Sequence, residues 1–223
     1  MDHQSDYLAL LRLMRERRSV RRFLDRSVPD AMLEQILEAA RWAPSWGNRQ
    51  AHRFLVVTSR TLIDSLGSAV RNAVSCCLDS CPEDRREEYA AYLKNFEHFT
   101  GAPVVVVPIF RRGDDLLAPV MPASGTDGEA PLRPLLESVS SVSAAVMNLL
   151  LAAHALGLGA CWMTGPLIAG EVLREALRVP EGWEIAALIP LGFPAEEPEA
   201  PSRRPLSTLV RHAGDPPESG SEP

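Results

Sequence analysis

The sequence predicts an α+β fold, in which helices flank a sheet of four to five strands. Apolar residues make up 46% of the chain, which is enough for a sizeable core. Four consecutive valines lie within residues 103–110, as expected for a strand buried on both faces. Apolar residues between 30 and 40 recur at helical spacing. Strands and helices therefore share one chain, which is typical of this fold class.

The predicted elements follow in order. Ser5 can cap a first helix, and Pro29 suits the first turn of a second. Further along we expect a strand at 54–58, helices at 60–80 and 83–99, a strand at 103–110 and a long central helix at 135–156. Gly157 and Gly159 end that helix. A strand at 160–164, a helix near 168–178 and a strand at 183–191 complete the set.

We expect residues 1–210 to form one domain. Residues 111–134 are rich in proline and glycine and have little periodicity, which predicts a variable insertion or a lid loop. Seven prolines follow residue 193, with no helical or strand period, which predicts an extended arm. Residues 211–223 are expected to be a flexible, acidic, proline-rich tail.

Basic residues are concentrated in an acidic chain. The 223 residues carry a net charge of -6, and Lys94 is the only lysine, yet seven arginines lie between positions 12 and 26. The acidic balance argues against nucleic acid or anionic membranes as partners. The apolar stretch 144–163 is interrupted by Asn148 and His154, so we expect a buried helix that leads into a strand, not a membrane span. Without a signal-like N-terminus, a cytoplasmic location is expected.

The cysteines do not predict a metal site. Cys76, Cys77, Cys81 and Cys161 lack the paired spacing and the histidine partners of such sites. We expect them to be reduced thiols.

The core of the arginine segment, residues 17–23, lies where the first helix ends and an extended stretch begins. In an extended stretch Ser19 and Arg21 point to one side and Val20 to the other. Converging guanidinium groups and a hydroxyl would hold a phosphate or a polar ring. A solvated helix face with favourable charge at its C-terminus explains the same residues.

A second basic pair, Arg203 and Arg204, lies in the proline-rich arm just before the apolar segment 206–210. If the arm packs down, both arginine clusters could converge on one anion. A solubilising pair among acidic neighbours is the alternative.

Four motifs, in this order, resemble those of the nitroreductase family of flavin-dependent oxidoreductases. They are 17–21 with Phe23; 43–50 leading into the strand at 54–58; the helix through 148–154 closing with 157–166; and 189–194 followed by 203–206. Together they span about residues 10–210. Each motif is loose alone, and the ordered set is specific.

The resemblance implies an α+β homodimer with a mostly antiparallel central sheet, FMN at the subunit interface and a C-terminal arm exchanged between subunits. It implies FMN contacts at Arg17, Arg18, Ser19, Arg21, Pro44, Ser45, Asn48, Trp162, Met163, Thr164, Gly165, Arg203 and Arg204. In many members the loop of Pro44, Ser45 and Asn48 comes from the other subunit. Trp46 stands where a small residue is common, so it could narrow the pocket or stack on a substrate ring, or simply pack.

The implied activity is transfer of hydride from NADH or NADPH to flavin N5, followed by reduction of a nitroaromatic, quinone or related flat acceptor in a ping-pong mechanism. No side chain is assigned as catalytic, because solvent can supply the protons. The alternatives are a biosynthetic flavin dehydrogenase, a reductive dehalogenase of the same superfamily, and a flavin-binding protein with little turnover.

Overall fold

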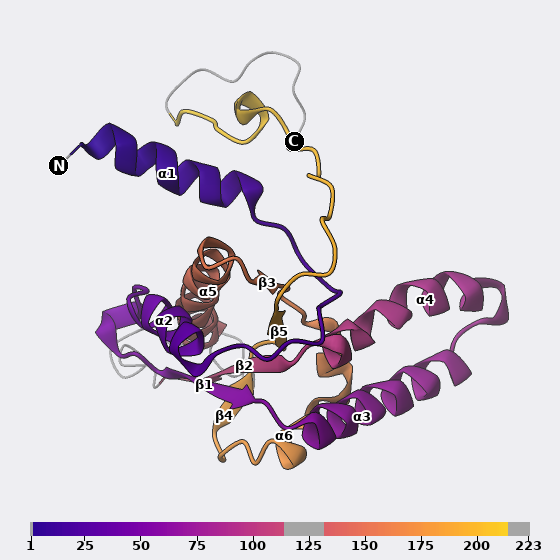
Figure 1. The fold of residues 1–223 in the computed structure, drawn as a ribbon. Helices are drawn as coiled ribbons and strands as arrows, with labels where there is room; N and C mark the ends of the chain where they lie inside the picture. Colours follow the sequence, from indigo (N-terminus) through magenta and orange to yellow (C-terminus); the bar gives the residue numbers. More distant parts are fainter. Residues whose placement is uncertain (1, 114–131, 214–223) are drawn as a thin grey trace, which may run out of the picture.

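A five-stranded sheet organises the computed structural model, which describes residues 2–113 and 132–213 (Figure 1). The strands are β1 (His52–Val57), β2 (Val104–Arg111), β3 (Gly159–Ala160), β4 (Trp183–Ile185) and β5 (Ile189–Gly192). Their order is β1-β2-β5-β3, β4 also pairs with β2, and every strand pair is antiparallel. In the register, Val106 lies opposite Val56 of β1 and Ile189 of β5. The predicted α+β class and its mostly antiparallel sheet are confirmed.

Helices cover both faces of this sheet (Figure 1). They are α1 (His3–Glu16), α2 (Asp30–Arg41), α3 (Arg60–Asp79), α4 (Arg86–Leu93), α5 (Leu132–Ala155) and α6 (Gly170–Ala176). Short 3-10 turns lie at η1 (Trp46–Asn48), η2 (Glu83–Arg85), η3 (Lys94–Gly101), η4 (Gly165–Ala169) and η5 (Leu206–Thr208). Val104 and Val106 pack with α2 and α5, whereas Val105 and Val107 pack with α3 and α6. The valine run is therefore buried on both faces, as predicted.

Several predicted boundaries are wrong. Asp2, not Ser5, caps α1, since its carboxylate accepts the N–H of Gln4 at 3.2 Å. Pro29 lies at the N-cap of α2, one residue before the first turn. The helix expected at 83–99 ends at Leu93, where the Asn95 amide donates to the carbonyls of Ala91 and Tyr92 and competes with helical bonding.

Two predicted strands are shorter. The strand expected at 160–164 is two residues long, because Met163 pairs only with Leu188, in an isolated bridge. The strand expected at 183–191 divides into β4 and β5, whose pairing registers with β2 differ by one residue: Ile185 lies opposite Ile109, and Ile189 lies opposite Val106. Helix α5 begins at Leu132, inside the expected loop 111–134, and residues 114–131 of that loop lie outside the described residues. Residues 214–223, which make up most of the predicted tail, also lie outside the described residues.

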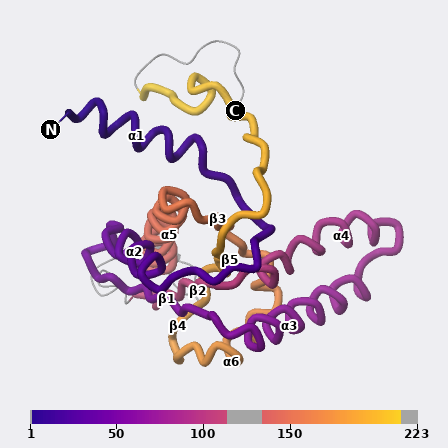
Figure 2. The backbone as a smooth tube through the Cα atoms, in the orientation of Figure 1, coloured from indigo at the N-terminus to yellow at the C-terminus, as the bar shows by residue number. Residues whose placement is uncertain are grey.

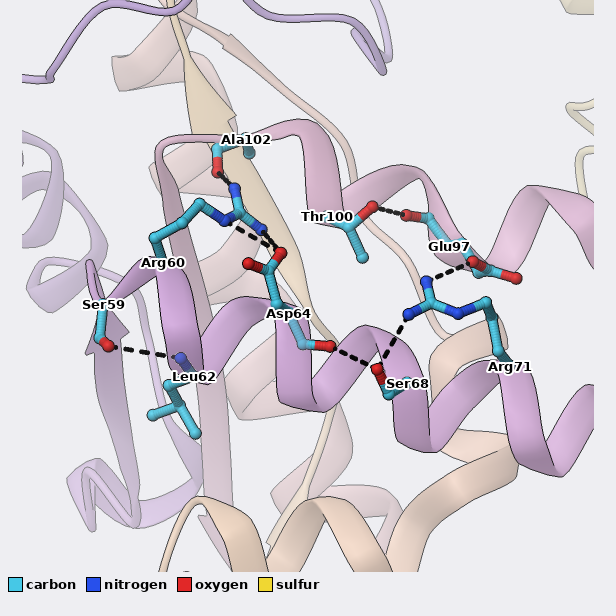
Figure 3. Close-up of polar contacts among 9 residues, drawn as sticks. All are labelled: Ser59, Arg60, Leu62, Asp64, Ser68, Arg71, Glu97, Thr100 and Ala102. Atoms are coloured by element: carbon cyan, nitrogen blue, oxygen red, sulfur yellow. Dashed lines mark hydrogen bonds and ion pairs between the residues drawn. The ribbon is translucent and has the colours of Figure 1, made fainter.

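Polar contacts and one close approach join α3 to η3 (Figure 3). Arg60 binds Asp64 at 2.8 Å and the carbonyl of Ala102 at 3.2 Å. Farther along α3, Arg71 pairs with Glu97 of η3 at 2.9 Å (Figure 3). A side chain at Gly67 would lie 2.5 Å from the Thr100 methyl group, so only glycine permits this packing.

Helix α5 is apolar on more sides than the single chain covers. By length and composition it could cross a membrane over Pro134–Ala155, yet Val146, Leu149 and Ala153 lie in the core. The amide of Asn148 donates to the carbonyl of Ala39 in α2 at 3.2 Å, so this polar residue is accommodated in the packing. Only 28% of the most apolar stretch is buried, so the expected central burial is incomplete within one chain.

Helix α1 and the C-terminal segment 194–213 lie to one side of the sheet (Figures 1 and 2). No residue of α1 is buried, and Tyr7, Leu8 and Met14 are about half exposed. In the C-terminal segment, Leu206 is 73% exposed and Leu209 is 65% exposed. Both segments therefore present apolar side chains that their own chain does not cover.

Candidate functional site

The arginine segment lies beside β3. Val20 donates its N–H to Ala160 O at 3.1 Å, and Ser19 forms a parallel bridge with the same residue. A Cβ atom at Gly159 would lie 2.7 Å from the Val20 side chain, so glycine lets the two backbones approach. The segment is thereby placed next to the chain that runs on to residues 162–165.

The other edge of the segment is held by the start of the C-terminal arm. Leu24 donates to Phe193 O at 2.9 Å, and Ala195 donates to Arg22 O at 3.0 Å. The guanidinium of Arg26 lies over the Phe193 ring, 3.7 Å from its centroid. The first, third and fourth motifs therefore meet, although they are far apart in the sequence.

The predicted arginines differ in their bonding. Arg17 has a buried Nε atom without a hydrogen-bond partner in the described part of the chain. Arg18 turns back and donates to the carbonyls of Arg15 and Arg17 at 2.6 and 2.7 Å. Arg21 is exposed and makes one long side-chain bond, to Ser19 O at 3.3 Å. Arg18 thus commits one terminal nitrogen to its own backbone, whereas Arg17 and Arg21 keep most of their donors for a ligand.

A cavity of about 340 Å³ opens between the end of α1, the C-terminal end of α5 and the start of the arm. Arg17 and Arg18 line it together with His154, Gly159 and Glu196. Burial lowers the pKa of His154, so its imidazole is neutral at pH 7. The cavity lining therefore combines the two guanidinium groups with carboxylates, among them Glu196, and with apolar side chains such as Leu150.

Residues 162–165 are held rigidly by their neighbours. Met163 exchanges two backbone hydrogen bonds with Leu188, at 3.1 and 2.9 Å. Gly165 lies against the Phe96 ring so closely that any Cβ atom there would overlap it. Phe96 in turn meets Tyr92 edge-on, with the ring centroids 5.3 Å apart. Trp162 is half-buried and Thr164 is exposed. The backbone of this segment therefore has a fixed position beside the arginine segment.

The loop that contains Pro44, Ser45 and Asn48 has an unusual backbone. Gly47, Asn48 and Gln50 have φ values of 55°, 52° and 49°. Such angles cost a non-glycine residue on the order of 1 kcal/mol or more and cluster at functional sites. Ser45 Oγ accepts the N–H of Gln50 at 3.0 Å and stabilises the turn.

Trp46 is partly exposed in the same loop. Its side chain is stacked by Arg49, whose guanidinium lies 4.4 Å from the ring centroid. Its backbone N–H donates to Ser141 Oγ in α5 at 3.0 Å. The loop is therefore attached to the N-terminal half of α5.

One chain does not bring all predicted residues together. The loop is attached at Ser141, whereas the arginine cavity is lined by His154, thirteen residues farther along α5. At 1.5 Å per residue these points are about 20 Å apart. The arm residues Arg203 and Arg204 are exposed, and Arg203 donates only to the adjacent carbonyls of Pro201 and Ser202. The convergence of both arginine clusters on one anion is therefore not made within the chain.

The structure adds residues that sequence reasoning missed. Glu196 binds the arginine segment, Phe96 packs on Gly165, and Arg49 stacks on Trp46. No sequence signal separated Glu196 from its acidic neighbours in the arm. For the loop, the only available hint was Gly47, a residue suited to positive φ.

The sheet topology and the arginine segment beside β3 define an α+β fold that carries a basic segment at the edge of its sheet. The sequence pattern of the nitroreductase family matches residues 14–193, so the chain belongs to that family of oxidoreductases. A relative in Methanothermobacter thermautotrophicus, provisionally named NADH dehydrogenase/NAD(P)H nitroreductase, is 30% identical over 201 residues. These cover 89% of this chain and 84% of the relative.

Solved structures support the same assignment. A BluB-like flavoprotein from Clostridium difficile superposes with a TM-score of 0.80 at 24% identity, covering 91% of this chain and 98% of that protein, and establishes likeness of fold. A nitroreductase from Desulfovibrio desulfuricans, solved in complex with FMN, is 31% identical with a TM-score of 0.65. The match covers 93% of this chain and 98% of that one.

Proposed function

We propose that the protein is an FMN-dependent oxidoreductase that accepts electrons from NADH or NADPH and reduces a nitroaromatic, quinone or similar flat acceptor in a ping-pong cycle. Membership of the nitroreductase family and a 30% identical relative named for NAD(P)H chemistry support this proposal. FMN in the Desulfovibrio desulfuricans structure supports the choice of flavin.

The residues present fit such a cofactor. Arg17 has a buried donor atom without a partner beside the cavity, which suits a phosphate oxygen. Arg21 is an exposed cation in the same segment, suited to the electron-rich pyrimidine side of a flavin. When bound, FMN supplies the two-electron chemistry.

The protein's own groups have two tasks in this proposal. Arg17, Arg18, Ser19 and Arg21 bind the phosphate and the polar ring edge. The fixed backbone of 162–165 presents one wall to the ring and excludes water from that side. Protons come from solvent at the open side, so no side chain is required as a general acid.

We further propose that each site is shared between two chains of a homodimer. Ser141, which holds the 43–50 loop, and His154, which lines the arginine cavity, lie about 20 Å apart along α5. If the α5 helices of two copies pack antiparallel around a two-fold axis, the loop of one chain meets the arginine segment of the other. The separation of Ser141 and His154 along α5 is the single observation that supports the two-chain site.

Uncovered apolar surface supports that pairing. Leu136 of α5 is 54% exposed and Val139 is 38% exposed, which leaves an apolar flank for a second copy. The exposed apolar residues of α1 and of η5 suit the same partner. An arm that embraces the second chain would also carry Arg203 and Arg204 away from their own cavity and toward the partner's.

Absorbance spectroscopy of the purified protein tests the proposal. We expect a yellow protein that holds one FMN per chain, elutes as a dimer and bleaches anaerobically when NADH or NADPH is added. A yellow protein that neither nicotinamide reduces would contradict the NAD(P)H step. A protein that takes up no FMN would contradict the proposal as a whole.

A further inference from the structure

Glu196, at the start of the C-terminal arm, binds the arginine segment through three hydrogen bonds. Its Oε1 atom accepts the backbone N–H of Arg21 at 2.6 Å and that of Arg22 at 3.1 Å. Its Oε2 atom accepts Nε of Arg22 at 2.9 Å. The carboxylate side chain is only 18% exposed, unlike that of a freely solvated surface glutamate. One side chain thus receives two successive backbone donors and one guanidinium donor.

These contacts determine which way the neighbouring arginines point. In extended backbone, side chains alternate, so Val20 and Arg22 lie on one side and Ser19 and Arg21 on the other. Val20 is buried in the core, and Arg22 is turned to Glu196. Arg21 is therefore left on the Ser19 side. Within residues 2–113 and 132–213, the Arg21 guanidinium makes one bond, the long one to Ser19 O, so most of its donors can meet a ligand.

The hydrogen bonds of Glu196 supplement the backbone pairing of the arginine segment. Val20 bonds to Ala160 on one edge, and Leu24 and Arg22 bond to Phe193 and Ala195 on the other. None of these backbone bonds uses the N–H of Arg21, which goes to Glu196 instead. Without the carboxylate, the peptide unit before Arg21 has no described partner for its donor and can rotate.

We propose that Glu196, which lines the cavity beside Arg17, is a positioning residue for the flavin site and sets the direction of Arg21 through the backbone. This inference rests on the proposed FMN function. Because the carboxylate belongs to the start of the arm, it also ties the cofactor segment to the element that leaves toward the partner chain. Its loss weakens FMN binding through Arg21.

Titration of apo protein with FMN, followed by flavin fluorescence, tests this role. We expect Glu196→Ala to weaken FMN binding about tenfold or more, the range for loss of charge-assisted hydrogen bonds. Glu196→Gln keeps one oxygen for the two backbone donors and should recover most of the affinity. Glu199→Ala, an exposed acidic change in the same arm, should leave the affinity unchanged.

A double-mutant cycle separates positioning from general stability. If Glu196 acts through Arg21, then Glu196→Ala has no further effect on FMN affinity in an Arg21→Ala background. An equal loss in both backgrounds would overturn the inference. Should Glu196→Ala fail to fold, Glu196→Asp, whose shorter side chain withdraws the carboxylate from the two backbone donors, replaces it in the same cycle with Arg21→Ala.

FMN binding by the protein and the positioning role of Glu196 are contradicted by different results. Wild-type protein that takes up no FMN contradicts the proposed function itself. Wild-type protein that binds FMN, together with a Glu196→Ala variant of equal affinity, contradicts only the positioning role.

Discussion

The backbone N–H of Trp46 donates to Ser141 Oγ at 3.0 Å, and the same hydroxyl donates to Glu137 O at 2.7 Å. This pair of bonds links the strained 43–50 loop to the N-terminal half of α5. The loop is thereby held far from the arginine segment of its own chain. The geometry of the whole proposed site depends on this attachment.

Ser141→Ala removes the attachment. We expect a loss of about 1 kcal/mol in the free energy of unfolding, measured by urea denaturation, because the Trp46 N–H loses its partner. FMN affinity should fall as well, since the loop is no longer held. Ser140→Ala, an exposed change one residue earlier, is the matched control. Unaltered FMN affinity in Ser141→Ala would show that the loop plays no part in binding.

Gly47→Ala tests the backbone conformation of the loop. The φ of Gly47 is +55°, and the nearest atom to an added Cβ is Arg49 Cγ at 3.9 Å, so the cost is conformational and not steric. We expect destabilisation of about 1 kcal/mol in urea unfolding. Gly170→Ala, at the start of α6 with open space around it, should be neutral or stabilising. Equal behaviour of the two variants would refute the strained turn.

Arg21→Ala removes the exposed cation of the arginine segment. We expect FMN affinity to fall about tenfold or more, because a charge-assisted contact to the flavin is lost. Flavin fluorescence during titration of apo protein measures the change. Arg15→Ala, on the exposed side of α1, is the control. If both variants retain FMN equally, the assignment of Arg21 to the flavin is wrong.

The contribution of Glu196 to the stability of the protein should depend on pH. Hydrogen bonds from the Arg21 and Arg22 backbone hold the pKa of Glu196 below its usual value of 4.5. A depressed carboxyl pKa contributes stability above the unfolded pKa, and this contribution is lost as the pH falls through the folded pKa. We therefore expect wild type to be more stable than Glu196→Gln at neutral pH, and the gap to narrow as the pH falls below 4.5 and through the lowered pKa of Glu196. A gap that is constant from neutral to acidic pH would contradict the ionised carboxylate.

The sheet was largely predictable because its strongest signal is local. The valines of β2 alternate between two core clusters, so a run without polar residues could only be a doubly covered strand. The break after α4 was not predictable from periodicity, since it depends on Asn95 bonding back to Ala91 and Tyr92.

The candidate site was predictable only in part. The arginine segment and residues 162–165 follow family motifs, and strand pairing at Ala160 brings them together. Glu196 was missed because its contact spans 175 positions, and no local pattern marks it. The apolar character of α5 indicated burial, yet sequence cannot tell whether its own chain or a second copy covers a helix.

A doubly tagged mixed dimer tests the two-chain site most directly. One chain carries Arg21→Ala, and the other carries Ser45→Ala with Asn48→Gly, which keeps the positive φ at residue 48. If each site takes its arginine segment from one chain and its loop from the other, the mixed dimer has one intact site and one doubly altered site. We predict about half the wild-type FMN content per dimer, clearly above either altered homodimer. A mixed dimer that holds no more FMN than the average of the two altered homodimers would contradict the shared site.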